Sequence, residues 1–69
     1  MVEKITGILN EIGFANISYD YRDDNSYYFD AYSDVLVEIR VGIDGEVAKV
    51  FEKYITDKHF VFFGNFYTK

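Results

Sequence analysis

The chain has 69 residues, of which 20% are aromatic, and a formal net charge of −5 at pH 7. A chain this short forms a single domain, here residues 1–69, and its hydrophobic core supplies only about 3–5 kcal/mol. The absence of cysteine excludes disulfides and thiolate metal sites, and fits a reducing compartment, so we expect a cytoplasmic protein. No apolar run approaches the length of a membrane span, and we expect no membrane contact.

The first predicted element is a helix from Val2 to Ile12, because its apolar residues recur at helical spacing with polar residues between them. Gly13 and Phe14 follow at the positions where a Schellman motif ends a helix. Gly7 lies inside this helix. It is either simply tolerated or lets the helix approach a sheet closely.

Two segments with strand-like alternation come next, Ile17–Arg22 and Tyr27–Tyr32. The four residues between them, 23–26, are Asp, Asp, Asn and Ser, which are typical of turns. If Asp20 and Asp30 share one face of the sheet, the connecting loop holds an odd number of residues, because a slip of one residue exchanges the faces. We therefore expect a loop of about three or five residues.

The clearest alternation runs from Val35 to Ile43 and predicts the central strand of the sheet. The segment after it is ambiguous. Asp44-Gly45 is a hairpin signal, yet the apolar residues of 47–55 recur at spacings of three and one, as on a helix. We favour a helix over 46–57, with Asp44 as its N-terminal cap.

The chain closes with an aromatic strand from Phe60 to Tyr67, in which Gly64 marks a bulge or a close contact. This strand is apolar on both faces, so it is either sandwiched or part of an interface. The predicted order is α-β-β-β-α-β. This is an α+β domain with a mainly antiparallel sheet and its helices on one face.

Charge is concentrated in the middle of the chain. Between Ile17 and Glu46, eight acidic residues stand against two arginines, a formal charge of −6, while the remainder has five lysines against four acidic residues. Within Tyr19–Asp34, five aspartates alternate or cluster with five tyrosines. Such a surface repels nucleic acid and favours basic proteins.

We therefore predict a partner-binding face, in which the carboxylates pair with Arg or Lys and the phenol rings supply contact area. Its predicted residues are Asp20, Tyr21, Asp23, Asp24, Tyr28, Asp30, Tyr32 and Asp34. Duplex DNA carries a charge every ~1.7 Å, whereas alternate strand residues are ~7 Å apart, so these aspartates replace a handful of phosphates. The same stretch also fits an ordinary solvent-exposed sheet face.

Other chemistries have weaker support in the sequence. The one histidine, His59, lies two residues from Asp57, the only pair that resembles a base and its orienting group. The calcium-loop pattern fails, because it needs Gly at its sixth and Glu at its twelfth position. We expect no catalytic residue, no cofactor, no metal and no direct nucleic-acid contact.

In size, charge, lack of cysteine and element order, the chain resembles the small acidic inhibitors encoded by phages and mobile elements, including anti-CRISPR proteins. No motif is shared, so the resemblance assigns no role to any residue. It implies a non-enzymatic inhibitor that blocks the basic nucleic-acid-binding site of a target such as a Cas effector, as a local DNA mimic.

Three alternatives stay open at this point. The first is a structural or adaptor subunit that dimerises through the aromatic C-terminal strand. The second is an immunity-type inhibitor of a nuclease. The third is a small hydrolytic or metal-dependent enzyme that uses His59. We expect the protein to be a monomer or a homodimer.

Overall fold

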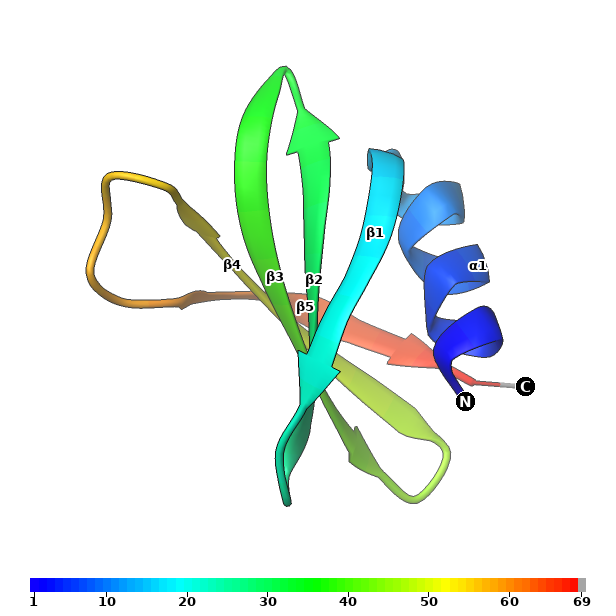
Figure 1. Cartoon of the computed structure of the whole chain (residues 1–69). Coiled ribbons are helices and arrows are strands. Elements are labelled where there is room, and N and C mark those ends of the chain that lie inside the picture. Colours follow the sequence, from blue (N-terminus) through cyan, green and yellow to red (C-terminus); the bar gives the residue numbers. More distant parts are fainter. Residues whose placement is uncertain (69) are drawn as a thin grey trace.

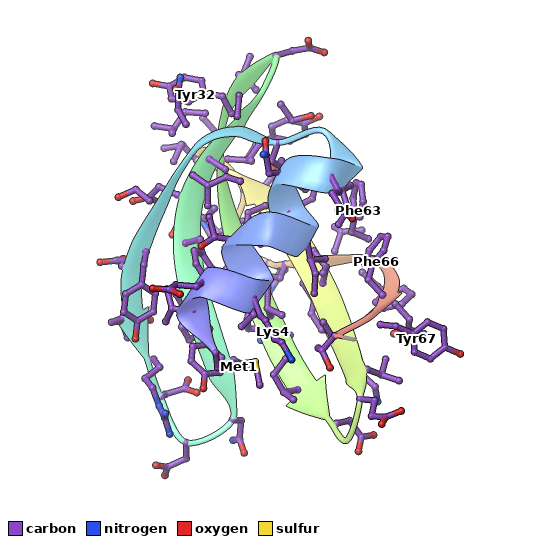
Figure 2. All side chains as sticks on the ribbon, turned by 90° about the vertical axis from the view of Figure 1, so that its right-hand side faces the viewer. Met1, Lys4, Tyr32, Phe63, Phe66 and Tyr67 are labelled. Atoms are coloured by element: carbon purple, nitrogen blue, oxygen red, sulfur yellow. The ribbon has the colours of Figure 1, made fainter. Side chains whose placement is uncertain are left out.

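The computed structural model describes residues 1–68 and contains one helix followed by five strands (Figure 1). The elements are α1 (Val2–Ile12), β1 (Ala15–Arg22), β2 (Ser26–Ser33), β3 (Val35–Asp44), β4 (Val47–Tyr54) and β5 (Val61–Tyr67). The strands form one antiparallel sheet in the order β1-β2-β3-β4-β5, so each strand pairs with the next in sequence. The helix lies across one face of this sheet (Figure 2).

The predicted α-β-β-β-α-β order is wrong at one element. Residues 46–57 do not form a helix: β4 occupies Val47–Tyr54 and pairs with β3 along its whole length. The fold is therefore α-β-β-β-β-β, with a single helix on one face. The Asp-Gly hairpin signal was the correct indication.

The hairpin between β3 and β4 has a two-residue loop. Asp44 pairs with Val47, which leaves Gly45 and Glu46 between the strands. Gly45 has φ 62°, and a glycine with positive φ at the first loop position is the mark of a type II′ turn. Asp44 does not cap a helix; its carboxylate lies 3.5 Å from the ammonium of Lys49.

The helical pattern in β4 arose because this strand is apolar on both faces. Ala48 and Val50 are fully buried on the helix-covered side. Phe51 points to the other side, where its ring packs against that of Phe62 at 5.4 Å. Apolar residues on both faces remove the two-residue period and leave spacings that resemble a helix. The helix-like spacing in β4 therefore results from aromatic side chains on the face of the sheet that the helix does not cover.

Helix α1 ends as predicted. The N–H of Gly13 donates to the Asn10 carbonyl at 3.2 Å, and the N–H of Phe14 donates to the Leu9 carbonyl at 3.1 Å. These are the two hydrogen bonds of a Schellman motif, and Gly13 has φ 123°, which favours glycine. Gly7 is exposed, and a Cβ there would meet no atom within 4 Å. It is tolerated in the helix and does not serve a close approach to the sheet.

The core lies between α1 and the covered face of the sheet. Its buried residues are all hydrophobic: Ile5, Leu9, Phe14, Phe29, Ala31, Val37, Ile39, Val41, Ala48 and Val50. Three of them come from alternate positions of β3, which is the middle strand of five. The prediction of a central strand over Val35–Ile43 is confirmed.

The β1–β2 hairpin contains the predicted short loop and an unpredicted bulge. Three residues, 23–25, separate the two strands, which is one of the two expected lengths. Arg22 pairs with Tyr27, however, so an even number of residues, 23–26, lies between the paired positions, and the odd spacing expected to put Asp20 and Asp30 on one face is absent. Tyr19 pairs with Phe29 and Tyr21 with Tyr28, so Asp20 is an extra residue in β1. Because of this bulge, Tyr19 lies on the covered side against Phe29, whereas Tyr21 lies on the opposite side.

Candidate protein-binding face

The sheet face opposite α1 carries four of the eight side chains predicted to bind a partner, those of Tyr21, Tyr28, Asp30 and Tyr32. We call it the open face. Its members follow from strand register and alternation and include Ser18, Tyr21, Tyr28, Asp30, Tyr32, Leu36, Glu38, Arg40, Gly42, Lys49, Phe51, Lys53, Phe62 and Asn65. In the part of the chain that the structure describes, no helix covers these residues.

A row of large side chains crosses the open face from one edge of the sheet to the other. We call it the aromatic row: it consists of Tyr21, Tyr28, Arg40, Phe51 and Phe62, one from each strand in direct register. Side chains in register on neighbouring strands are close enough to contact. The row is therefore a continuous feature of the sheet.

The contacts along this row are specific. The rings of Tyr21 and Tyr28 stack with centroids 4.5 Å apart and an interplanar angle of 5°. The guanidinium of Arg40 lies 4.5 Å from the Phe51 ring centroid and 5.1 Å from that of Phe60. Cation–π contacts of this kind are worth about 0.5–1 kcal/mol each at exposed sites. Arg40 thus joins the tyrosine and phenylalanine halves of the row.

A second, charged row runs beside the aromatic row. Asp30, Glu38 and Lys53 are in register across β2, β3 and β4. The Lys53 ammonium donates to the Glu38 carboxylate at 2.6 Å, and the Lys53 side chain is only 15% exposed. It also donates to the carbonyl of Asp57 at 3.2 Å. The ammonium group of Lys53 is therefore already paired within the domain and is not free to bind a partner.

Asp30 is a carboxylate without a partner whose surroundings disfavour its charge. It is half-buried, and none of the described residues donates a hydrogen bond to it or pairs with it. Burial raises the pKa of Asp30, and the nearby carboxylates of Asp20 and Glu38 raise it further. A negative charge at this position costs free energy unless something outside the domain compensates it.

Asp23 has the opposite environment. Its carboxylate accepts the N–H groups of Asn25 and Ser26 at 2.9 and 2.8 Å and the hydroxyl of Tyr28 at 2.9 Å. These hydrogen bonds, that of Asn25 foremost, lower the pKa of Asp23. The same contact with Asp23 raises the pKa of the Tyr28 hydroxyl. Asp23 therefore holds the β1–β2 turn and orients Tyr28.

The remaining predicted residues do not all come together. Asp24 is exposed in the β1–β2 loop, whereas Asp34 forms the turn between β2 and β3 with φ 68°, at the other end of the eight-residue strand β2. Tyr32 is 43% exposed on the open face near that second turn. The open face brings together Tyr21, Tyr28 and Asp30 with the bulge residue Asp20, but it separates Asp34 from Asp24.

Several residues of the open face were not predicted to contribute to a site. Arg40 belongs to the predicted central strand but has no predicted role, and Phe51 lies in the segment predicted to be a helix. Phe60 lies in the β4–β5 connection, yet its ring reaches the open face, 6.2 Å from Tyr28. No single-sequence signal shows that a loop side chain folds back onto a sheet. The register of β4 would have revealed Phe51 and Lys53.

The residues considered for catalysis or metal binding are not members of the open-face rows, although the carbonyl of Asp57 accepts a hydrogen bond from Lys53. His59 and Asp57 are both exposed in the β4–β5 connection. Among residues 1–68, no three His, Cys, Asp or Glu side chains are grouped so that they could hold a metal ion. The only helix of that region, α1, is too short to cross a membrane.

Comparison of the chain with protein-family models, with curated proteins and with solved structures gives no match. A function for this chain therefore has to be inferred from the geometry and charge of the open face.

Proposed function

We propose that this protein is a non-enzymatic binding protein that docks its open face onto a basic surface of a cytoplasmic partner protein. The observation that carries the proposal is the uncompensated carboxylate of Asp30, half-buried between the carboxylates of Asp20 and Glu38. An Arg or Lys side chain of a partner would supply the missing hydrogen bonds and the opposite charge.

The surroundings of Asp30 support an arginine or lysine partner. Tyr21 is 52% and Tyr32 43% exposed, and both frame the charged row. Guanidinium groups stack on aromatic rings while they bind carboxylates bidentately. Tyrosine also adds rigid contact area at low entropic cost. The combination is that of a binding hot spot for a basic side chain.

Direct binding of nucleic acid has less support on this face. Sheets that stack bases surround their aromatic side chains with free Lys and Arg. Here Lys53 is paired with Glu38, and Arg40 is held between two phenylalanine rings. The net charge of −5 adds long-range repulsion of phosphates.

A basic surface that lacks its own acidic partners is typical of proteins that handle nucleic acid. We therefore propose that the domain blocks such a site, as an inhibitor of the anti-CRISPR or nuclease-inhibitor kind. Because Asp23 is committed to its turn and Asp34 lies at the far end of β2, the contact is local. The interacting set is Asp20 and Asp30 with Tyr21, Tyr28 and Tyr32.

The test is affinity capture with three immobilised baits: the wild-type chain, the double variant Asp20→Asn/Asp30→Asn, and the control Glu3→Gln/Glu11→Gln. Both variants lose two negative charges, but Glu3 and Glu11 lie on α1, on the other side of the sheet. We expect wild type and control to retain the same basic protein and the open-face variant to lose it. Equal retention by all three baits would end the proposal.

A second measurement tests inhibition. The captured protein is bound to a labelled oligonucleotide, and each bait is added as competitor. Wild type and control should displace the oligonucleotide, less effectively as salt rises, and the Asp20→Asn/Asp30→Asn variant should not. Binding of bait without any displacement would show that the partner uses a surface other than its nucleic-acid site.

A further inference from the structure

We infer that strand β5 (Val61–Tyr67) is a dimerisation edge, where a second copy of the chain adds its own β5 in antiparallel orientation across a two-fold axis. The sheet order leaves β1 and β5 at the two ends, each with one unpaired edge. The two edges differ in charge, shape and exposure, and these differences select β5.

The backbone of β5 offers hydrogen-bonding groups to a neighbour. The N–H of Thr68 donates to the Glu46 carbonyl at 2.8 Å, and Tyr67 pairs in register with Val47. In an antiparallel pair, alternate residues direct their N–H and C=O groups toward the partner strand. Asn65 and Tyr67 therefore direct theirs away from β4, toward the open edge of the sheet.

The other edge of the sheet is protected. Strand β1 contains a bulge at Asp20 and carries the charged side chains of Asp20 and Arg22. Bulges and charges are devices by which edge strands avoid pairing with other chains. Strand β5 also has a bulge, at Phe63, but it contains no charged residue. With one edge protected and one available, association closes at two copies instead of growing into a filament.

The distribution of charge indicates that the partner at the β5 edge is a second copy of the chain. At a net charge of −5, two copies repel each other across most of their surfaces. The β5 edge is the uncharged exception, with Val61 63%, Phe62 53% and Tyr67 76% exposed. A basic partner would gain nothing from this neutral strand, whereas a second acidic copy meets no charged side chain of β5 there.

A groove beside β5 provides a place for side chains of the second copy. It lies between α1 and β5, has a volume of about 320 Å³, and is lined by Ile8, Glu11, Ile12, Phe66 and Tyr67. In Figure 2, Phe66 lies beside the helix while Tyr67 points away from the body of the domain. An added strand at this edge runs alongside the groove and brings its own aromatic side chains to it.

The dimer has a consequence for binding. Antiparallel edge pairing has its two-fold axis perpendicular to the sheet, so both helices lie on one side and both open faces on the other. The result is a continuous ten-stranded sheet, twice the five strands of one chain, with a doubled open face. Two linked sites raise avidity for a partner with repeated basic sites.

The experiment is sedimentation velocity on the full chain at micromolar to millimolar concentrations, with the variants Asn65→Lys and Ser18→Lys. Both residues are exposed polar residues on edge strands, one on β5 and one on β1, so the two variants carry matched charge changes. We expect the wild type to dimerise, Ser18→Lys to behave like it, and Asn65→Lys to raise the dimer dissociation constant about tenfold or more.

Circular dichroism verifies that both variants keep the fold. Amide exchange supplies a second readout on the unmodified chain: the amides of Asn65 and Tyr67 should exchange more slowly as concentration rises, while those of β1 should not change. A strict monomer throughout, or a dimer that Asn65→Lys leaves unaffected, would overturn the inference. The outcome is independent of the capture experiment, because neither Asp20 nor Asp30 is altered.

Discussion

The two faces of this sheet are built from different kinds of side chain. The covered face buries aliphatic residues and one phenylalanine of β2, and in residues 1–68 no polar or charged side chain is buried with them. The open face carries stacked aromatic rings, an arginine between two of them, and a carboxylate without a partner. Stability depends on the first face, and the second is available for recognition.

The largest expected difference between the faces is in their response to truncation. Phe29 is 1% exposed in the core, and Phe62 is 53% exposed on the open face. Phe29→Ala should cost about 3–5 kcal/mol, which is as large as the stability of so small a domain, and leave it unfolded. Phe62→Ala should cost about 1 kcal/mol, mostly its ring contact with Phe51.

Urea denaturation followed by circular dichroism measures both variants. A loss of similar size for Phe29→Ala and Phe62→Ala would mean that the open face contributes to folding as much as the core does. The division between a folding face and a binding face would then be wrong.

A smaller effect is expected from Phe60, which joins the β4–β5 connection to the open face. Its ring lies 6.2 Å from that of Tyr28, and the charged groups of Arg40 and Lys53 lie over it at 5.1 and 5.8 Å. Phe60→Ala should cost about 1–2 kcal/mol, because it removes one aromatic and two cation–π contacts. Amide exchange in residues 55–60 should accelerate while β3 is unaffected.

Ile55→Ala is the matched control for Phe60→Ala. Ile55 belongs to the same connection but is 52% exposed, so its truncation should change neither stability nor exchange measurably. If both substitutions loosen the connection equally, the contacts of Phe60 with the open face do not anchor it.

The covered face could be predicted well from the sequence, and the open face could not. Helix α1 and strand β3 each present one apolar side, so a single period identifies them. Strand β4 presents Val50 to the core and Phe51 to the open face, and this double use erased the period. The error over 46–57 occurred in the strand whose two faces are both apolar.

The structure brings only part of the predicted site together on one face of the sheet. The tyrosines and aspartates of 19–34 predict a binding face because they are clustered in the sequence. The turn-forming residues 23–26 indicate that Asp23 bonds its own turn, where it accepts three hydrogen bonds. No local signal shows that Asp30 accepts none among the described residues. The bulge at Asp20, which moves Tyr21 to the open face, depends on pairing with β2 and has no local signal.

The smallest expected effect on stability comes from the charges of Asp23 and Asp30, which act in opposite directions. The lowered pKa of Asp23 means that the folded state favours its ionised form. Its contribution is present above the ordinary carboxyl pKa and is lost as pH falls through the lowered value. The pKa of Asp30 is raised, so the folded state favours its protonated form, and stability falls as pH rises from the ordinary pKa through the raised value.

At neutral pH, therefore, Asp23→Asn should destabilise the domain and Asp30→Asn should stabilise it, and both differences should shrink in acid. The urea midpoints of both variants and the wild type, measured at neutral and at acidic pH, test these differences in stability. A destabilising Asp30→Asn would show that the carboxylate has an internal role. If Asp30→Asn instead stabilises the chain and weakens capture of a basic partner, the domain sacrifices stability at Asp30 for binding, as a recognition site does. A partner cation would then compensate the charge that the fold leaves unpaired there, and binding would lower the pKa of Asp30.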